Sequence, residues 1–199
     1  MAGVSRPDFW DALYAAGGDG WELGAAAPPL VDVVERTPPP RGRVAVLGCG
    51  RGHDARLLAA RGYEVVGYDF STAAVEAARA LAPRDGLNVR FEQRDIFTLG
   101  RDEAHAFDGV WEYTCFCAID PTRRDEYVRT VASILRPGGW LLACFFPLRG
   151  GGAGPPFPVT RAEVRRRFAG SFRFERAQPP LRSARGRQGR EWLVLARRT

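Results

Sequence analysis

Short apolar runs alternate with stretches of helical spacing along most of the chain. Residues 44–47 and 64–69 are runs of strand length, and residues 54–61 between them have the spacing of a helix that ends at Gly62. This order predicts a strand, a helix and a second strand, which is the pattern of a parallel β-α-β unit.

The same alternation continues through the middle of the chain. We expect a helix that Ser71 caps and that ends by Pro83, a third strand at 88–93, a polar loop at 99–105 and a fourth strand at 106–112. These elements extend the predicted parallel sheet by two more strands.

A further helix and a long apolar run follow. The helix begins at Asp120-Pro121, carries an apolar stripe as far as Leu135 and ends at 137–139. Residues 140–146 are almost continuously apolar, which is typical of a central strand that is covered on both faces.

The last part of the chain contains one helix and two strands. A glycine- and proline-rich loop at 147–158 precedes a capping box at 160–163, which opens the helix. Strands at 172–177 and 191–196 lie on either side of an arginine-rich hairpin or loop. The whole pattern predicts an α/β fold with a mostly parallel seven-stranded sheet, right-handed crossovers and an antiparallel C-terminal pair. A chain of 199 residues is expected to form a single domain.

The segment before the first strand predicts two short helices. The first places four large side chains on one face, namely Phe9, Trp10, Leu13 and Tyr14. Glycines at 17–20 break this helix before Trp21, and residues 30–36 form the second helix. Two compatible interpretations stay open. Either the aromatic face docks on the core, or residues 1–40 form a helical lid whose rings cover a cationic ligand, since cations are attracted to ring faces.

The turn at 48–52, Gly-Cys-Gly-Arg-Gly, is the first candidate for ligand binding. Small residues let the backbone approach a ligand, and the start of the next helix offers free N–H groups. Asp69 follows Gly48 by 21 residues, close to the separation at which such a unit presents an acid to a ribose. A nucleoside-bearing ligand is therefore expected.

Two other nucleotide sites are excluded by the same turn. A dinucleotide fingerprint would need a glycine in place of His53. A phosphate-binding P-loop would need a lysine, whereas all 29 basic residues of this chain are arginine.

Polar or glycine residues follow four of the predicted strands. They are the turn at 48–52, Asp69, Asp95 and Glu112. Because ligands bind at the carboxyl ends of parallel strands, we expect these positions to meet in one crevice.

The net charge of +6 and the pI of about 9.7 raise nucleic acid as a partner. The arginines are spread along the chain, however, with local concentrations only at 165–167 and 182–190 and no accompanying aromatic stacking motif. A solvated basic face is the favoured interpretation, and nucleic acid is not an expected partner.

Cysteine content and hydropathy limit the remaining possibilities. The four cysteines lack the spacing of a zinc site, so we expect them to be reduced, buried and not bound to metal. The sequence has no apolar run that would span a bilayer and no secretory leader pattern, so the cytoplasm is the expected location, without a membrane partner.

With these motifs, the chain resembles class I S-adenosylmethionine-dependent methyltransferases, including Leu-Arg-Pro-Gly-Gly-Trp at 135–140. More narrowly, it is similar to the thiopurine methyltransferase family and its thiol and halide methyltransferase branch. The matching segments are Trp10 with Trp21, RDIF at 94–97, EYTCFCAIDP at 112–121, GPPFPV at 154–159 and, more weakly, GRE at 189–191. That branch usually carries aspartate in place of Glu112, and thiopurine enzymes carry arginine in place of Tyr113.

The resemblance implies a Rossmann-like fold and a set of cofactor contacts. Gly48, Cys49 and Gly50 would line the methionine part of S-adenosylmethionine, Asp69 would bind the ribose hydroxyls, and Asp95 and Ile96 would hold the adenine. Trp10, Tyr14, Trp21 and Tyr113 would close over the cofactor, and Phe70, Phe97 and Glu112 complete the expected set.

The expected acceptor is a small soft nucleophile, such as a thiol, a sulfide-like anion, a halide or thiocyanate. A thiol with a pKa of about 8.5 is partly ionised at neutral pH, and halides need no base. Neither His53 nor His105 lies in a recognisable triad. Tyr113 either orients the nucleophile as a catalytic residue or packs on the cofactor.

Other features of the acceptor side are open as well. Phe116, Phe146 and Phe157 are candidates for an apolar wall, and Arg149 is either an attractor of anionic substrates or an exposed loop charge. The alternatives to S-methylation are a small oxygen, nitrogen or thiopurine-like acceptor, and a non-catalytic module that binds S-adenosylmethionine or RNA. A monomer or a weak dimer is expected.

Overall fold

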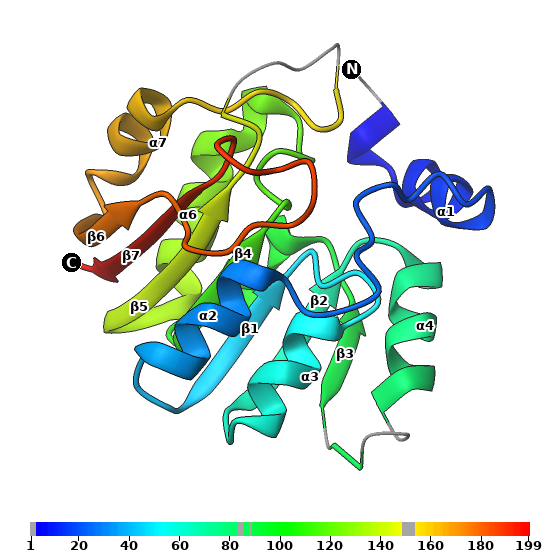
Figure 1. Cartoon of the computed structure of the whole chain (residues 1–199), viewed down its shortest axis with the longest axis horizontal. Helices are drawn as coiled ribbons and strands as arrows, with labels where there is room; N and C mark the ends of the chain where they lie inside the picture. The colour runs from blue at the N-terminus through cyan, green and yellow to red at the C-terminus, as the bar shows by residue number, and fades with distance from the viewer. Residues whose placement is uncertain (1–2, 83–85, 88, 149–153) are drawn as a thin grey trace.

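A computed structural model describes residues 3–82, 86–87, 89–148 and 154–199 of the protein (Figure 1). The strands are β1 (Arg43–Leu47), β2 (Glu64–Asp69), β3 (Arg90–Gln93), β4 (Phe107–Tyr113), β5 (Leu135–Phe145), β6 (Phe172–Gln178) and β7 (Trp192–Arg198). The helices are α1 (Pro7–Ala15), α2 (Pro28–Arg36), α3 (His53–Ala60), α4 (Thr72–Leu81), α5 (Leu99–Asp102), α6 (Arg124–Ile134) and α7 (Arg161–Phe168).

All seven strands belong to one sheet with the order β3-β2-β1-β4-β5-β7-β6. The pairs β1-β2, β2-β3, β1-β4 and β4-β5 are parallel, and β7 pairs antiparallel with both β5 and β6. The predicted fold class is therefore confirmed. The chain builds outward from β1 in one direction and then crosses to β4 on the other side, so the switch point of the sheet lies between these two strands.

The first strand shows why the sheet carries a helix layer on each face. Along β1, Val44 and Val46 belong to one buried cluster, which includes apolar side chains of α2, α3 and α4. Ala45 and Leu47 belong to the other cluster, which includes apolar side chains of α6 and α7. Alternate residues of a strand point to opposite faces, so an apolar run without polar gaps predicts a strand that is buried on both sides.

Two local predictions were wrong. Residues 99–102 form the short helix α5 instead of a polar loop, because Leu99 is fully buried and anchors the segment to the core. Strand β5 begins at Leu135 rather than at residue 140: Leu135 is extended and pairs with Phe107, and the register then shifts before Trp140 pairs with Gly109. The apolar side chain of Leu135, which the sequence assigned to a helix stripe, is thus buried by a strand with a bulge.

Other expected boundaries differ by a few residues. The helix predicted from Asp120-Pro121 begins as a short 3₁₀ helix, Pro121–Arg123, before α6. The expected start of the third strand at Asn88 lies outside the described residues, and β3 begins at Arg90.

Helix α1 lies on the start of α4, beyond the carboxyl ends of the strands (Figure 1). The Asp11 carboxylate accepts hydrogen bonds from the Ser71 hydroxyl at 2.6 Å and from the Ala73 backbone N–H at 3.2 Å. Helix α2 is different, since its Leu30 is fully buried against the sheet. Of the expected lid at 1–40, the described part up to Trp21 contributes to the site described below, and α2 contributes to the core.

Gly109 offers a direct test of the packing between β4 and β5. A Cβ atom at Gly109 would lie 2.1 Å from two ring carbons of Trp140, whose indole is 1% exposed and donates a hydrogen bond to the Pro40 carbonyl at 3.1 Å. We expect Gly109→Ala to lower the free energy of unfolding by about 2 kcal/mol or more, because the indole has no room to move. Gly170→Ala is the control, since nothing lies within 4 Å of its added methyl group.

Urea unfolding followed by tryptophan fluorescence measures the effect. An unfolding midpoint for Gly109→Ala equal to that of Gly170→Ala would contradict the assigned packing.

Candidate active site

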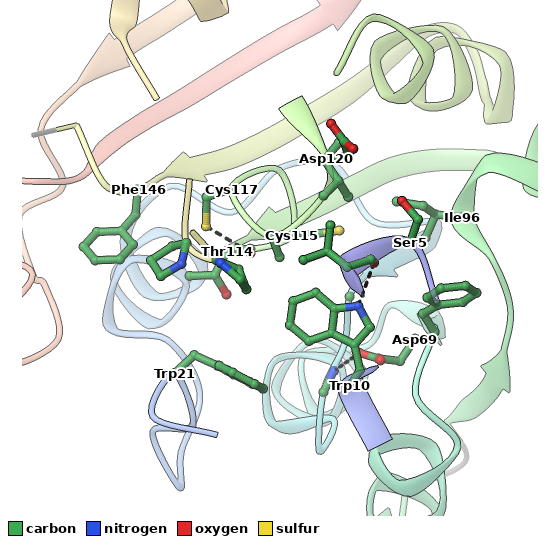
Figure 2. Close-up of a pocket in the computed structure, with 18 of the residues that line it drawn as sticks. Ser5, Trp10, Trp21, Asp69, Ile96, Thr114, Cys115, Cys117, Asp120 and Phe146 are labelled. Atoms are coloured by element: carbon green, nitrogen blue, oxygen red, sulfur yellow. Dashed lines mark hydrogen bonds between the residues drawn. The ribbon is translucent and has the colours of Figure 1, made fainter. Parts of the chain in front are cut away.

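A cavity of about 530 Å³ lies at the carboxyl ends of the parallel strands, next to the switch point (Figure 2). Its volume is in the range of about 300–1,000 Å³ that is usual for small-molecule sites. Two ends can be distinguished. The β2–β3 end consists of Asp69, Phe70, Asp95, Ile96 and Phe97, and the β5 end consists of Cys117, Phe146, Pro155, Pro156, Arg187 and Arg190. Figure 2 shows Asp69 and Ile96 on one side of Trp10, and Cys117 and Phe146 on the other.

The glycine turn forms part of the cavity between these ends. Gly48 and Gly50 line the cavity and have left-handed backbone conformations, with φ of +62° and +53°. A Cβ atom at Gly48 would lie 3.0 Å from the Cys115 Cβ atom, so the turn also needs glycine for packing. The Gly50 N–H donates to the Asp69 carboxylate at 2.8 Å, which fixes the turn against the end of β2.

Asp69 connects two loops. Its carboxylate also accepts a hydrogen bond from the Ser71 N–H at 2.9 Å, at the start of α4. Burial raises the pKa of Asp69, although the hydrogen bonds from Ser71 and Gly50 oppose this shift. The side chain lies at the cavity wall at the place that the sequence predicted.

The segment after β3 completes the β2–β3 end. The Asp95 carboxylate accepts a hydrogen bond from the Phe97 N–H at 3.0 Å and so caps the short turn that presents Ile96 to the cavity. The Arg123 guanidinium lies 3.5 Å from the centre of the Phe97 ring and also lines the cavity. This end thus combines the carboxylates of Asp69 and Asp95 and the Arg123 guanidinium with flat apolar surfaces.

The aromatic residues of the N-terminal segment cover the cavity. The rings of Trp10 and Tyr14 each lie edge-on to Trp21, at 5.7 Å and 5.6 Å between centroids. The Trp21 indole N–H donates to the Tyr14 hydroxyl at 3.3 Å, and an ion pair between Asp19 and Arg51 at 2.5 Å ties the segment to the glycine turn. All three rings line the cavity. The aromatic face of α1 thus lines the cavity and has no fully buried residue, and the covering of a cationic ligand stays a prediction.

Several expected site residues do not line the cavity. Cys49 and Tyr113 line a separate pocket of about 70 Å³ next to the glycine turn. The Tyr113 hydroxyl donates to the buried Glu191 carboxylate at 2.6 Å, and burial raises the pKa of Tyr113. Its hydroxyl is thus turned toward β7, which leaves the ring as its contribution near the turn.

Glu112 also points into the interior. It is 1% exposed, and its carboxylate accepts a hydrogen bond from the Phe116 N–H at 2.9 Å. Burial raises the pKa of Glu112 to about 7. Its structural effect is to hold the loop that follows β4.

Of the three phenylalanines expected to form an apolar wall, only Phe146 lines the cavity. Phe116 is buried in the core, with its ring 5.4 Å from those of both Tyr127 and Phe145. Phe157 is 5% exposed, and its N–H donates to the Cys117 carbonyl at 2.7 Å. Arg149, the expected attractor of anions, lies outside the described residues.

Two loops contribute residues to the cavity that were not predicted as site residues. The first is the loop at 114–120, which begins with Thr114 at φ +65° and supplies Cys115, Cys117 and Asp120. Its position directly after β4, at the switch point, was the available indication. The second is the loop between β6 and β7, which supplies Arg187 and Arg190; the weak GRE match at 189–191 was the available indication.

Neither a candidate metal site nor a membrane-spanning helix is found among the described residues. In the described part of the chain, no group of three or more histidine, cysteine, aspartate or glutamate side chains is placed to hold a metal ion. No helix of the described residues is both long and apolar enough to cross a membrane. The four cysteines are buried and unpaired, as predicted.

The family model of thiopurine S-methyltransferase matches residues 5–191. The chain belongs to the thiopurine S-methyltransferase family. It is therefore a methyltransferase that uses S-adenosylmethionine. This confirms the family, the enzyme class and the cofactor that the sequence motifs predicted, whereas the individual residue contacts with the cofactor stay predictions.

Relatives within the family differ in their named acceptors. The chain is 34% identical over 156 residues to probable thiol methyltransferase 2 of Arabidopsis thaliana. The aligned region covers 77% of this chain and 68% of that protein. It is 33% identical over 153 residues to thiocyanate methyltransferase 1 of Brassica oleracea. The aligned region covers 75% of this chain and 66% of that protein. The chain thus spans about two thirds of the length of these plant relatives.

Solved structures show the same fold. A 1,6-didemethyltoxoflavin-N1-methyltransferase from Burkholderia thailandensis, solved with S-adenosylhomocysteine bound, superposes with a TM-score of 0.75 at 26% identity. The match covers 100% of this chain and 88% of that chain.

The raised pKa of Glu112 leads to a prediction about stability. The folded protein holds a proton on Glu112 up to about pH 7, whereas the unfolded chain releases it near its ordinary pKa of 4.5. Between these values the folded state binds more protons, so the free energy of unfolding falls as pH rises, by up to about 3 kcal/mol from this group. Glu112→Gln keeps an oxygen that accepts the Phe116 N–H but does not ionise.

We therefore expect the melting temperature of Glu112→Gln, relative to that of the unaltered protein, to rise steadily between pH 5 and pH 8. Thermal unfolding followed by circular dichroism gives both values. A constant difference across this range would show that Glu112 is not protonated in the folded state.

Proposed function

We propose that this protein methylates a small soft nucleophile: a thiol, a sulfide-like anion, a halide or thiocyanate. The observation that carries the proposal is the chemistry of the β5 end. It presents the Phe146 ring, two prolines, the Cys117 thiol and two arginines, and no carboxylate or histidine among its described residues. Such a surface suits a nucleophile that arrives as an anion and needs no base.

The β2–β3 end fits the nucleoside part of S-adenosylmethionine. Asp69, Asp95 and Ile96 line this end. The Asp69 carboxylate would accept hydrogen bonds from ribose hydroxyls, and Asp95 and Ile96 would offer an acceptor and an apolar surface to an adenine ring. The left-handed turn at Gly48 and Gly50 leaves space for close approach of the methionine part. The fit rests on this donor and acceptor set rather than on the name of any relative.

The aromatic cover fits the charge of the same ligand. A sulfonium is a cation, and cations are attracted to the faces of aromatic rings. Trp10, Tyr14 and Trp21 all line the cavity, and Figure 2 shows Trp10 between its two ends. These rings also exclude water from the path of the incoming nucleophile.

The chain's own residues position and desolvate the reactants. When bound, S-adenosylmethionine supplies a methyl group on a sulfonium, and the methyl–sulfur bond breaks as the bond to the nucleophile forms. Alignment of the nucleophile behind the methyl carbon accounts for up to about 7–11 kcal/mol of barrier reduction. The carboxylates that line the cavity already accept backbone N–H groups: Asp69 from Gly50, Asp95 from Phe97 and Asp120 from Thr122. They serve as structural acceptors, and no proton transfer is assigned to them.

The Tyr113 hydroxyl is not needed in this scheme. The hydroxyl is engaged by the hydrogen bond to Glu191, and the Tyr113 ring lies beside the glycine turn. Of the two roles predicted for Tyr113, we favour packing beside the cofactor over orienting the nucleophile.

The first test concerns the ribose contact. We expect Asp69→Asn to weaken the binding of S-adenosylhomocysteine at least tenfold in isothermal titration calorimetry, because an amide presents one acceptor oxygen where the carboxylate presents two. Asp102→Asn removes the same charge from an exposed carboxylate on α5 and is the matched control. Equal affinities for the two variants would refute the assignment of Asp69 to the ribose.

The second test concerns the acceptor. Incubation with S-adenosylmethionine and, in turn, iodide, thiocyanate, a small aliphatic thiol, a thiopurine, a phenol and an amine is followed by mass spectrometry of the products. We expect methylation of the sulfur and halide acceptors. Turnover of thiocyanate should be level between pH 6 and pH 9, whereas turnover of the thiol should rise toward its pKa of about 8.5.

The other outcomes separate the alternatives. Methylation of the phenol or the amine alone would favour an oxygen or nitrogen acceptor. Binding of S-adenosylhomocysteine without any methylated product would favour a non-catalytic module. Either result would remove the proposed acceptor class.

A further inference from the structure

A buried arginine of the loop between β6 and β7 connects the β5 end of the cavity with the N-terminal segment. Arg187 is 8% exposed and lines the cavity. One guanidinium nitrogen, Nη2, donates a hydrogen bond to the Trp21 carbonyl at 3.0 Å. The same side chain thus touches the aromatic cover and the site proposed for the acceptor.

The charge of Arg187 is poorly neutralised. Its guanidinium carbon lies 5.0 Å from the ring centres of both Tyr113 and Phe146. Within the described part of the chain, no carboxylate oxygen lies within 4.0 Å of its nitrogens, and buried Nη1 has no hydrogen-bond partner. Removal of a guanidinium from water without a counter-charge is costly.

A buried acid of the same loop already accepts a hydrogen bond from another residue. The Glu191 carboxylate, four residues further along the chain, accepts the hydrogen bond from Tyr113, and its second oxygen has no partner among the described residues. A second buried arginine shows the contrast: Arg124 is 3% exposed and forms an ion pair with Glu163 at 2.9 Å. The Nε atom of Arg124 also lacks a hydrogen-bond partner among the described residues, but Arg124 has a carboxylate beside it, whereas Arg187 has none within 4.0 Å.

We propose that Arg187 is an anion subsite for the acceptor and that it couples acceptor binding to closure of the N-terminal segment over the cofactor. This inference rests on the proposed function. A soft anion at the β5 end supplies the missing counter-charge and is bordered by the Phe146 ring. With its charge compensated, Arg187 holds the Trp21 carbonyl in place, and Trp21 in turn packs against Trp10 and Tyr14.

The coupling has a measurable consequence. If an anion and the cofactor product both favour the closed arrangement, each tightens the binding of the other by the same factor. The probe is thiocyanate, which is anionic throughout the neutral pH range, and the titrated ligand is S-adenosylhomocysteine, which carries no methyl group to transfer. The measurement is therefore independent of turnover.

The experiment is isothermal titration calorimetry of S-adenosylhomocysteine in sodium thiocyanate and in sodium fluoride at equal ionic strength. For the unaltered protein we expect at least fivefold tighter binding in thiocyanate, within the usual range of coupling between two sites. Arg187→Gln should abolish this gain. Arg185→Gln removes the same charge from an exposed position of the same loop and should keep it.

The urea unfolding midpoint of Arg187→Gln shows whether this variant folds. If it does not fold, Arg187→Lys is tested in its place. A single ammonium group does not span the Trp21 carbonyl and an anion as the guanidinium fork does, so we expect the gain to fall at least twofold. An undiminished gain in Arg187→Lys or Arg187→Gln would overturn the proposal.

The result for the unaltered protein separates this inference from the proposed function. Binding of S-adenosylhomocysteine with the same affinity in thiocyanate and fluoride would overturn the anion subsite, and turnover in the acceptor panel would still stand. A failure to bind S-adenosylhomocysteine under either condition would instead remove the proposed function itself.

Discussion

The cavity depends first on how the Asp69 carboxylate is shared between two backbone N–H groups. One belongs to Gly50 in the turn after β1, and the other belongs to Ser71 at the start of α4. A single buried side chain thereby sets the separation of two loops from neighbouring strands. The Ser71 hydroxyl in turn donates to Asp11, so the docking of α1 depends on the same loop. Loss of this arrangement would release the turn, the start of α4 and the aromatic cover together.

The two ends of the cavity differ in charge, and this difference matches the reaction. The β2–β3 end carries the carboxylates of Asp69 and Asp95 beside the Arg123 guanidinium, whereas the β5 end carries the guanidinium groups of Arg187 and Arg190 and no carboxylate among its described residues. In the proposed arrangement, the positively charged donor lies nearer the carboxylates and the electron-rich acceptor lies nearer the arginines. The aromatic residues between the ends exclude water and so strengthen both interactions. Methyl transfer from a sulfonium requires this positioning more than it requires a proton shuttle.

Much of the fold followed from local patterns. The strands, the glycine turn and the capped helices depend on neighbouring residues along the chain, and the strand ends at Asp69 and Asp95 were predicted because parallel strands share one edge. Leu135 shows where local patterns fail: its apolar side chain fits a helix stripe and a strand equally well, and pairing with Phe107 decided for the strand. Phe116 and Phe146 show the same limit for the site, since the sequence marks both as apolar and only the packing places one in the core and the other at the cavity.

The sequence by itself determined the order of the elements, the glycine turn after the first strand and the family, because each of these is encoded in contiguous residues with fixed spacing. Only the tertiary structure decided which way the side chains face and which distant segments meet. The Tyr113 hydroxyl turns to Glu191, 78 residues further along the chain. Arg187 reaches the carbonyl of Trp21, 166 residues away. Such contacts depend on sheet order and loop packing, which no local pattern of residues records.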